Sequence, residues 1–413
     1  MFQWSEQHEA VREMLRVFCA QELVPHLDAL DTEQMLPYPI LRKLWEQFGI
    51  GEMGVADFHR RQKRARAQAA GEEVGERKAN ALGLTRGQAE AMRALPTIEL
   101  SRYAPGMVTA LGVSVGLTSE AILRAGTLEQ RDRFVPDLLS LNKIGAWAIT
   151  EPSSGSDAFG SMRCTARLEG DTFVINGQKT FITNGPHADT IVLYAKFDDG
   201  GPANKRRPVT FVLDGDTPGL TRAPAFRKMG MHSSPTGELF LDDVRVGLDR
   251  LLGEDLDKAL GSARAGAKQT FGQERIAVAA MGLGMIEQCL ELCVEYARTR
   301  KQFGRRIGDF QLIQDKLARM EVARINTENI LFRSFADLDI GRQGSLAEAS
   351  AAKLYCARAA MEVTLEAVQL HGGYGYMAEY RVEQLARDAK VLQIYGGTDE
   401  IQISQIARSL LAG

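Results

Sequence analysis

Residues 387–402, RDAKVLQIYGGTDEIQ, form the stretch from which the organisation of the chain can be worked out. The pattern predicts a helix that ends in a tight turn at Gly396-Gly397 and a second helix that begins at Thr398. Two consecutive glycines let the backbone approach another group closely, and the Thr398 hydroxyl can cap the second helix. The first N–H groups of that helix would then point outward. Taken alone, the stretch predicts two helices joined by a turn and nothing more specific.

The length and composition narrow the class of protein. At 413 residues the chain is long enough for about two to three structural units of roughly 150 residues. A net charge of −3 with 25% charged residues gives no reason to expect nucleic acid or a membrane surface as a partner. No apolar run approaches about 18 residues, the N-terminus lacks a signal-peptide pattern, and the five cysteines have neither a disulfide framework nor zinc spacing. We therefore expect a soluble, cytoplasmic protein.

The first third of the chain has helical periodicity. Apolar residues recur at helical spacing over residues 5–50 and again over 97–139, and prolines divide the first stretch into separate helices. Between these stretches, residues 59–66 form a basic run that could contact phosphate. Acidic residues follow at Glu72, Glu73 and Glu76, which favours an exposed helix face instead. We predict an N-terminal helical domain over residues 1–143.

The pattern changes near residue 144. Residues 164–179 alternate β-forming residues with turn signals at Gly170-Asp171 and Asn176-Gly177. Further strands are predicted over residues 190–196, 209–213 and 237–241. Together these strands predict a compact, mostly antiparallel β-domain over residues 144–253.

After residue 254 the chain has helical patterns to its end. They predict helices over 257–300, 308–338, 345–371 and 376–393, and hence a C-terminal helical domain over residues 254–413. The predicted fold is therefore mainly α, with a central antiparallel β-domain inserted between two helical bundles that pack together.

Motifs of several common enzyme classes are missing from the sequence. No Gly-x-Gly-x-x-Gly lies between a strand and a helix in the N-terminal half, and the glycines at 372–375 follow a predicted helix, so a Rossmann fold is disfavoured. No P-loop, zinc-protease helix or nucleophile elbow is present. A Ser-His-Asp triad could recruit Ser156, His232 and Asp157, but nothing in the sequence brings them together.

Four blocks of sequence carry a resemblance to a known family. They are AWAITEPSSGSD at 146–157, INGQKTFITNG at 175–185, RKQFG at 300–304 with Phe310-Gln311 after it, and QLHGGYGY at 369–376, which leads into the closing stretch. In their order and approximate spacing these blocks resemble the acyl-CoA dehydrogenase family. The layout of helices, sheet and helices predicted above matches the layout of that family.

The resemblance implies FAD as the cofactor. In the family the first two blocks lie against the isoalloxazine ring, and an apolar slab with a few fixed donors suits a planar, electron-accepting ring. The residues that the resemblance assigns to the ring are Trp147, Ile149, Thr150, Phe181, Ile182 and Thr183. Gly155 and Ser156 of the first block would lie near the pyrophosphate and the thioester ligand. Without the two blocks, Thr150 and Thr183 would be read as ordinary strand threonines.

The third and fourth blocks resemble those that hold the ADP half of FAD from a neighbouring subunit. Arg300 would pair with the pyrophosphate as a planar fork, although by itself it would be read as a solvated helix end. The residues assigned to this half are Arg300, Gln302, Phe303, Gln311, Gln369 and Gly373, with Thr398 and Glu400 of the closing stretch as further flavin contacts. The resemblance therefore implies FAD sites that are completed across a dimer interface, and a homotetramer.

The catalytic base is the point at which this chain departs from many family members. Removal of an α-proton from an acyl thioester needs a carboxylate in an apolar site that raises its pKa. Many members place this glutamate directly before the Gly-Thr of the closing stretch, where this chain has Gly396. The isovaleryl-CoA and long-chain branches carry it on the long helix, and FGQERIAVAA at 271–280 resembles that block, with Glu274 at the position of the base. A surface glutamate paired with Arg275 or Lys268 is the alternative interpretation.

The same resemblance assigns other residues to the substrate. The Gly396 backbone N–H would donate to the thioester carbonyl, a contact that does not depend on a side chain. Arg275 matches the position that approaches the CoA arm, and Ser156 and Tyr395 would contact the substrate as well. Residues 55–95 depart from the family pattern in a region that contributes to the acyl cavity, so the sequence gives no preference for chain length or branching.

The implied function is FAD-dependent α,β-dehydrogenation of an acyl-CoA to the trans-2-enoyl-CoA, as in fatty acid metabolism. Glu274 would take the α-proton, FAD N5 would take the β-hydride, and an electron-transfer flavoprotein would accept the electrons. Two alternatives stay open. One is a flavin oxidase or monooxygenase of the same superfamily, and the other is a non-catalytic subunit of a hetero-oligomer that binds acyl-CoA or FAD.

Overall fold

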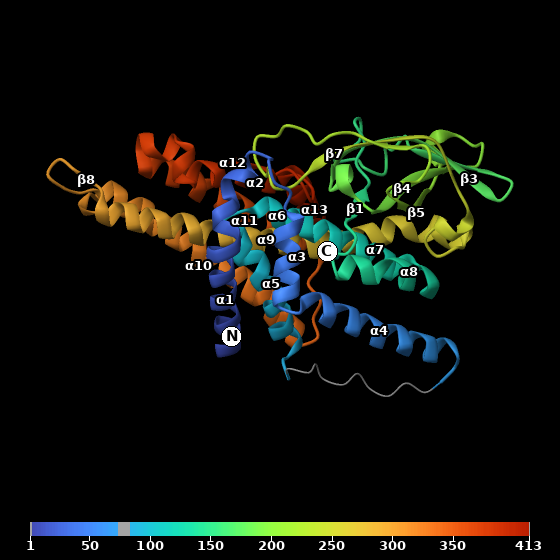
Figure 1. The fold of residues 1–413 in the computed structure, drawn as a ribbon, viewed down its shortest axis with the longest axis horizontal. Coiled ribbons are helices and arrows are strands. Elements are labelled where there is room, and N and C mark those ends of the chain that lie inside the picture. Colours follow the sequence, from blue (N-terminus) through green and yellow to red (C-terminus); the bar gives the residue numbers. More distant parts are fainter. Residues whose placement is uncertain (1, 73–82, 413) are drawn as a thin grey trace.

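The computed structural model describes residues 2–72 and 83–412, in which the N-terminal and C-terminal helices lie together and a β-sheet domain lies at one end of them (Figure 1). The N-terminal helices are α1 (Glu6–Phe18), α2 (Leu27–Asp31), α3 (Tyr38–Gln47), α4 (Ile50–Ala69), α5 (Arg86–Ser101), α6 (Pro105–Leu111), α7 (Ser119–Ala125) and α8 (Leu128–Leu139). The helices α1, α5 and α8 begin with capping boxes in which Ser5, Thr85 and Thr127 accept a backbone hydrogen bond. The predicted helical character of this region is confirmed.

The basic run lies on α4, which extends away from the body of the N-terminal helices (Figure 1). Only Gly51, Phe58 and Gln62 of this helix are buried, so the prediction of an exposed helix face is confirmed. Glu73 and Glu76, on which that prediction partly depended, lie outside the described residues.

The sheet of the middle domain is mixed. Its strands are β1 (Gly145–Ala148), β2 (Thr165–Glu169), β3 (Thr172–Thr183), β4 (Thr190–Asp198), β5 (Pro208–Asp214), β6 (Leu220–Arg222) and β7 (Thr236–Val246). The order is β1-β4-β2-β3-β7-β6, with β5 also paired to β4. The pairs β1–β4 and β2–β4 are parallel and the other pairs in this sheet are antiparallel, so the prediction of a mostly antiparallel domain is confirmed, but the two parallel pairs were not predicted. Turn signals identify hairpins, but they carry no information about strands that pair across a long connection.

One of the two predicted turns is absent. Gly170-Asp171 joins β2 to β3 as a hairpin, whereas Asn176-Gly177 lies inside β3, where the register with β7 shifts. A Cβ atom on Gly177 would lie only 2.7 Å from the Cys164 Cα. The glycine is therefore needed for close backbone approach at a bulge and does not mark a turn.

The C-terminal helices pack against the N-terminal ones. They are α9 (Leu256–Thr299), α10 (Gln311–Asp339), α11 (Leu346–His371), α12 (Val382–Leu392) and α13 (Asp399–Leu411), with a short hairpin of β8 (Lys301–Gln302) and β9 (Arg305–Arg306) after α9. Residues of both groups share one hydrophobic core. At one crossing, a Cβ atom on Gly284 of α9 would lie 2.0 Å from the Ile98 carbonyl of α5, so only glycine permits this approach.

Two helical stretches among the described residues, Pro105–Ala125 and Leu256–Thr299, are long and apolar enough to cross a membrane by length and composition alone. The expectation that no such stretch exists was therefore wrong. The most apolar windows of the two stretches are 56% and 67% buried inside the fold, which is the behaviour of helices that pack in a protein core.

Candidate active site

Glu274 and the closing turn meet in the folded chain. Between α12 and α13, Gly396 and Gly397 have φ angles of +61° and +93°, and Thr398 caps α13 by accepting a hydrogen bond from the Ile401 N–H, as predicted. A Cβ atom added to Gly396 would lie 3.3 Å from the Glu274 Cδ and within 3.5 Å of both carboxylate oxygens. The carboxyl group carried by α9 therefore lies directly beside the turn, where a side chain at position 396 would begin.

The surroundings of Glu274 suit a base. Its Oε2 atom is buried and has no hydrogen-bond partner among the described residues. Burial raises the pKa of Glu274 to about 7, against the opposing effect of the Arg275 and Lys353 cations. A carboxyl group with such a pKa can exchange a proton near neutral pH. The buried oxygen contradicts the surface-glutamate alternative, and the Lys268 side chain lies outside the described part of the chain.

Two buried side chains donate hydrogen bonds to the carbonyl groups of the turn. The Gln402 Nε2 donates to the Gly396 carbonyl at 3.1 Å and to the Gly397 carbonyl at 2.8 Å. The Lys353 Nζ, from α11, donates to the Gly397 carbonyl at 2.8 Å. Burial lowers the pKa of Lys353 to about 8, with Asp399 acting in the opposite direction.

The predicted substrate contacts Arg275 and Tyr395 lie next to these groups. The Arg275 guanidinium is buried and its Nη1 donates to the Ser350 Oγ of α11 at 2.8 Å. The Tyr395 hydroxyl donates to the Met281 Sδ at 3.3 Å and lies 3.4 Å from the Thr109 Oγ1. Arg275 is thus directed into the protein in this structure, and its contact with the CoA arm stays a prediction.

The segments assigned to the flavin ring come together at the ends of β1 and β3. The Thr180 N–H donates to the Thr150 carbonyl at 3.0 Å, so residues 147–150 and 181–183 lie side by side. The Trp147 ring packs edge-on against Phe271 of α9 at a centroid distance of 5.5 Å. Ile149 and Ile182 are buried, and Thr150 and Thr183 are partly buried. Through Phe271, this surface continues to the helix that carries Glu274.

A buried ion pair holds the backbone next to the residues that are predicted to bind the flavin ring. The Lys179 Nζ donates to the Glu151 Oε1 at 2.8 Å and to the Ile149 carbonyl at 3.2 Å. Both side chains are buried, and the Glu151 carboxylate also accepts the N–H groups of Arg163 and Cys164. The pair therefore fixes the backbone directly beside the predicted ring-binding residues.

The remaining predicted site residues of the first two blocks, Gly155, Ser156 and Phe181, are exposed. Gly155 and Ser156 lie in an exposed loop after β1, and no atom lies within 4 Å of a Cβ added to Gly155. The Phe181 side chain is 67% exposed and its φ angle is +56°, which is uncommon for an aromatic residue. An exposed aromatic ring held in a left-handed backbone conformation is a feature of a binding surface.

The hypothetical Ser-His-Asp triad does not form. The His232 Nδ1 lies 3.0 Å from Asp31 Oδ1, and its Nε2 lies 2.8 Å from the Lys228 carbonyl. The Asp157 carboxylate instead accepts hydrogen bonds from the Gly160 N–H and the Ser161 hydroxyl. Both ring nitrogens of His232 are thus occupied by other partners.

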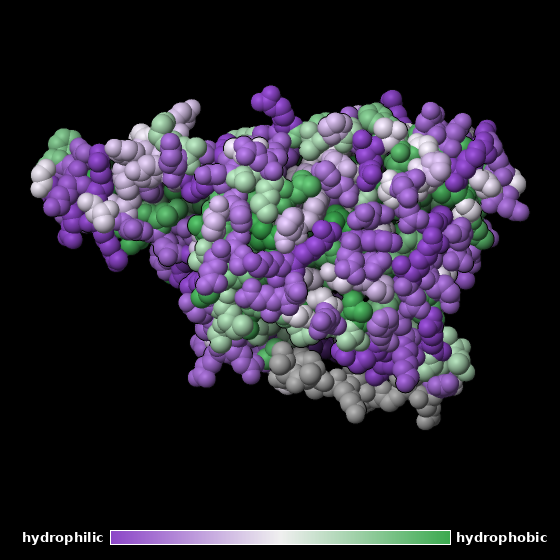
Figure 2. Space-filling view, viewed as in Figure 1, coloured by the Kyte–Doolittle hydropathy of each residue, from purple (hydrophilic) through white to green (hydrophobic). Residues whose placement is uncertain are grey.

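The residues assigned to the ADP half of FAD lie around a projecting arm of the folded chain, away from Glu274. The β8–β9 hairpin forms the tip of this arm at one end of the molecule, while β1 lies on the opposite side of the centre (Figure 1). Phe303, at the tip, is 91% exposed, and apolar atoms are visible there on the surface (Figure 2). The predicted ring and ADP contacts therefore do not converge within one chain.

A surface pocket of about 520 Å³ lies at the base of the arm. Its lining includes the predicted ligands Arg300, Gln302 and Gly373 together with Tyr374, whose ring lies 5.4 Å from the Arg300 guanidinium carbon. Gln311 and Gln369 are exposed at the ends of α10 and α11 nearby, and Glu400 is exposed on α13, where hydrogen bonds from backbone N–H and from Thr398 lower its pKa. The third and fourth blocks thus form one surface.

Comparison with known proteins decides the family. Residues 146–244 match the model of the acyl-CoA dehydrogenase middle domain, and residues 265–411 match that of the acyl-CoA dehydrogenase C-terminal domain. The chain belongs to the acyl-CoA dehydrogenase family. It is 35% identical over 410 residues to an acyl-CoA dehydrogenase of Bacillus subtilis (strain 168), with 99% of each chain covered. It is 31% identical over 409 residues to a caffeyl-CoA reductase-Etf complex subunit of Acetobacterium woodii, again with 99% of each chain covered.

The fold is shared with solved members of the family. The structure of butyryl-CoA dehydrogenase from Megasphaera elsdenii superposes with a TM-score of 0.82 at 30% identity, and all of both chains is covered. As a member of this family, the chain is a flavoprotein that uses FAD. The acyl group that it accepts is set by the residues of the site.

The residues of this chain fit FAD. The exposed Phe181 and the buried Ile182 beside the β1 end supply an apolar wall, and Gly155 leaves open space for close backbone approach. The pocket at Arg300 supplies a guanidinium and aromatic rings, a suitable setting for a pyrophosphate and an adenine. The structure therefore presents two separate surfaces that would hold the two halves of the cofactor.

Sequence reasoning named the apolar Phe271 as a neighbour of the base but missed Lys353 and Gln402, which contact the turn beside it. A signal for Lys353 was present, because on α11 it shares a face with the buried Ala349, Cys356 and Ala360. A lysine at such a core position needs a buried partner. The sequence did not show that this partner would be the Gly397 carbonyl.

Proposed function

We propose that this protein oxidises an acyl-CoA to the trans-2-enoyl-CoA and that Glu274 is the base. The observation that supports the proposal is the position of the Glu274 carboxyl, within 3.5 Å of where a Cβ at position 396 would lie. The glutamate that many family members carry on the turn is missing here, and a carboxyl group from α9 lies at the same turn. A buried, unpartnered oxygen completes the requirements for a base.

The geometry assigns a role to each group near the thioester. Glu274 takes the α-proton and becomes a neutral acid, a form that its burial favours. The Gly396 N–H donates to the thioester carbonyl oxygen and stabilises the negative charge that develops there. Bound FAD would supply the acceptor for the hydride that leaves the β-carbon. Trp147 and Phe271 exclude water between the flavin-binding strands and α9.

The test replaces Glu274 by glutamine, which has almost the same shape but cannot accept the proton. Glu274→Gln should retain bound FAD and lose flavin bleaching by acyl-CoA under anaerobic conditions. Glu295→Gln, an exposed glutamate on the same helix, is the matched control and should bleach like the wild type. Turnover of every accepted acyl-CoA by Glu274→Gln at near wild-type rates would refute the assignment.

The electron acceptor and the direction of the reaction also belong to the proposal. We infer that an electron-transfer flavoprotein takes the electrons, since a relative of similar length is a reductase that acts in an Etf complex. That relative also makes enoyl-CoA reduction a second candidate for this chain. Rapid reoxidation of the reduced flavin by air would instead support the oxidase or monooxygenase alternative. Reoxidation by an electron-transfer flavoprotein but not by air would support the dehydrogenase.

A catalytically silent subunit is the third reading of the family resemblance. The buried carboxyl at the closing turn argues against it, because a silent subunit needs no base. A visible spectrum of the purified chain after FAD reconstitution separates the two. A flavin band that acyl-CoA bleaches supports the enzyme, and absence of the band supports the silent subunit.

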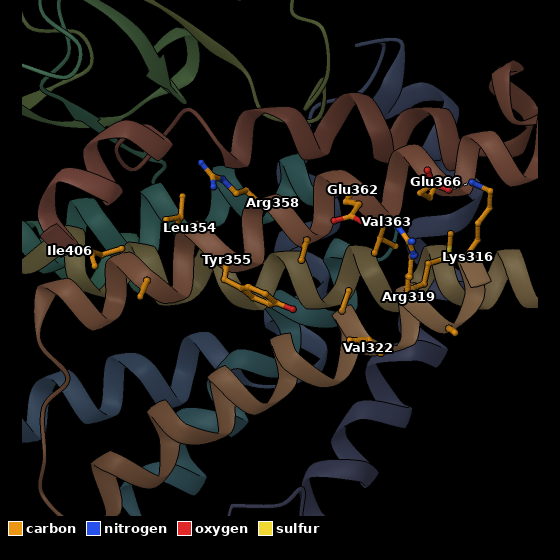
Figure 3. A pocket seen from close by; sticks show the side chains of 15 residues that line it. Lys316, Arg319, Val322, Leu354, Tyr355, Arg358, Glu362, Val363, Glu366 and Ile406 are labelled. Atoms are coloured by element: carbon orange, nitrogen blue, oxygen red, sulfur yellow. Dashed lines mark hydrogen bonds and ion pairs between the residues drawn. The ribbon is translucent and has the colours of Figure 1, made fainter. Parts of the chain in front are cut away.

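We further propose that the active form is a homotetramer with two contact surfaces on the C-terminal helices. One is the surface around the Arg300 pocket, where a neighbouring subunit would complete the FAD site, and the other is a groove. A groove of about 710 Å³ lies between α10, α11 and α13, and Tyr355 extends from α11 toward α10 (Figure 3). Its lining includes apolar side chains and charged side chains of both signs, a composition that suits contact with a second copy. These residues include Val322, Leu354, Tyr355, Val363 and Ile406, with Lys316, Arg319, Arg358, Glu362 and Glu366.

Light scattering on the holoenzyme tests the assembly. Val322→Asp places a charge in the groove, where the wild-type side chain is 57% exposed in the single chain, and should reduce the molar mass. Leu168→Asp changes a side chain on β2 that is 41% exposed and should leave the mass unchanged. A monomeric wild type with bound FAD would overturn the proposal.

A further inference from the structure

The Gly396–Gly397 turn is held by side chains that the reaction scheme has not used. Gln402 donates to both carbonyls of the turn, and Lys353 donates to the second of them. Both side chains come from buried positions, Gln402 on α13 and Lys353 on α11. On the basis of the function proposed above, we propose that Lys353 and Gln402 are positioning residues that hold the turn against Glu274.

The turn needs such support because its two glycines are intrinsically flexible. Gly396 and Gly397 both have positive φ angles, and glycine populates many other conformations at little cost. Hydrogen bonds to both carbonyls fix the peptide planes on either side of Gly397. The Gly396 N–H, which would donate to the thioester carbonyl, lies in the preceding peptide between Tyr395 and Gly396. Fixing the plane that follows Gly396 limits the backbone rotation at this glycine through which the N–H could turn relative to Glu274. Preorganised donors of this kind lower the barrier because they need no reorganisation during the reaction.

Lys353 also adds a charge to the buried region of the base. The cations of Lys353 and Arg275 both favour the ionised form of Glu274, and the negative charge of that carboxylate in turn helps to raise the pKa of the Tyr395 hydroxyl. On its other side Lys353 lies 3.9 Å from the Asp399 Oδ1, and Glu400 is a weaker neighbour. Asp399 is shared, because its Oδ2 accepts from the Arg358 Nε at 2.9 Å. Asp399 is therefore only partly available to neutralise Lys353.

Lys353 and Gln402 make separable contributions to the rate. Loss of Lys353 removes one hydrogen bond to the turn and one cation near Glu274, so the carboxyl should hold its proton to higher pH. Loss of Gln402 removes two hydrogen bonds to the turn and no charge. If Lys353 had only a structural role, its loss would not shift the acid limb of the pH–rate profile. If only the charge of Lys353 mattered and the turn needed no hydrogen bonds, loss of Gln402 would not change the rate.

The experiment measures anaerobic bleaching of bound FAD by saturating acyl-CoA from pH 5.5 to 9 in the holoenzyme. Lys353→Met and Gln402→Leu should keep their FAD and should each bleach about 100-fold more slowly, the size of effect that a misplaced reacting group produces. The acid limb should move to higher pH in Lys353→Met and stay in place in Gln402→Leu. Lys353→Arg should recover most of the rate, since it retains a charge and a donor.

Lys228→Met, which removes a largely buried lysine 3.8 Å from Glu33, is the matched control and should bleach like the wild type. A wild type that no acyl-CoA bleaches would refute the proposed function itself. A bleaching wild type with Lys353→Met and Gln402→Leu as fast as Lys228→Met would refute only the positioning role. If Lys353→Met is not recovered as folded holoenzyme, Gln402→Leu and Lys353→Arg decide, and wild-type rates in Gln402→Leu would overturn the proposal.

Discussion

Replacing Glu274 by glutamine should make the folded protein more stable at alkaline pH, although it removes the proposed base. The wild-type carboxyl group is buried, and its pKa rises from the usual 4.5 to about 7. A carboxyl group whose pKa is raised in the folded state favours folding when protonated and opposes it when ionised. Its contribution to stability is therefore fully present below pH 4.5 and is lost as the pH rises toward 7.

The size of this effect follows from the two pKa values. Above pH 7 the ionised carboxylate should cost about 3 kcal/mol of folding free energy relative to a neutral isostere. At pH 5 most of that cost is absent, and it should amount to roughly 1 kcal/mol. For a chain of 413 residues, these values correspond to a rise in Tm of about 4 °C at pH 8.5 and about 1 °C at pH 5 in Glu274→Gln.

Thermal unfolding with excess FAD at the two pH values is the assay. The comparison of variant with wild type at each pH cancels every other titrating group. Glu295→Gln, which changes an exposed carboxyl group, should show no difference that depends on pH. An equal Tm difference for Glu274→Gln at pH 5 and pH 8.5, or a lower Tm at pH 8.5, would show that burial of Glu274 does not raise its pKa.

Two further substitutions test the neighbouring structure. Gly397→Ala should destabilise the protein by about 1–3 kcal/mol, because its φ angle is +93° and the new Cβ would lie 2.8 Å from the Gln402 Nε2. Gly261→Ala, at an exposed position of α9 with no atom within 4 Å of the new Cβ, should not destabilise the protein in the same thermal assay. Lys179→Met should cost about 3–5 kcal/mol, because it leaves the buried Glu151 carboxylate without its cation. It should also weaken FAD retention, measured by gel filtration and absorbance, and full retention at wild-type Tm would contradict the supporting role of the pair.

Much of the fold could be predicted because its signals are local. Helical periodicity located α9, α10 and α11 to within a few residues, and the Gly170-Asp171 signal located the β2–β3 hairpin. The parallel pairing of β1 with β4 could not be predicted, since their paired residues Gly145 and Thr190 are joined by a long connection that contains another hairpin. The division at residues 143 and 253 stays a prediction.

The site divides in the same way. The turn at Gly396 and the cap at Thr398 follow from residue chemistry at adjacent positions, and both are present. The pairing of Glu274 with that turn was suggested by a resemblance, and the short distance between them gives it a physical basis. The contact of Lys353 with the Gly397 carbonyl depends on how α11 packs against the turn, which no pattern in either segment specifies.

The helix α9 carries Glu274 in its interior and ends directly before Arg300, about 39 Å further along at 1.5 Å per residue. Under the proposed assembly, one helix therefore serves two different catalytic centres, its own through Glu274 and a neighbour's through Arg300. Two individually inactive alleles, Glu274→Gln and Arg300→Ala, should then complement each other when their products assemble together. If the two products pair at random, about half of the pairs are mixed, and one of the two sites in each mixed pair has both an intact base and an intact arginine. About a quarter of all sites would then be active in cells that express both products, although neither product is active alone.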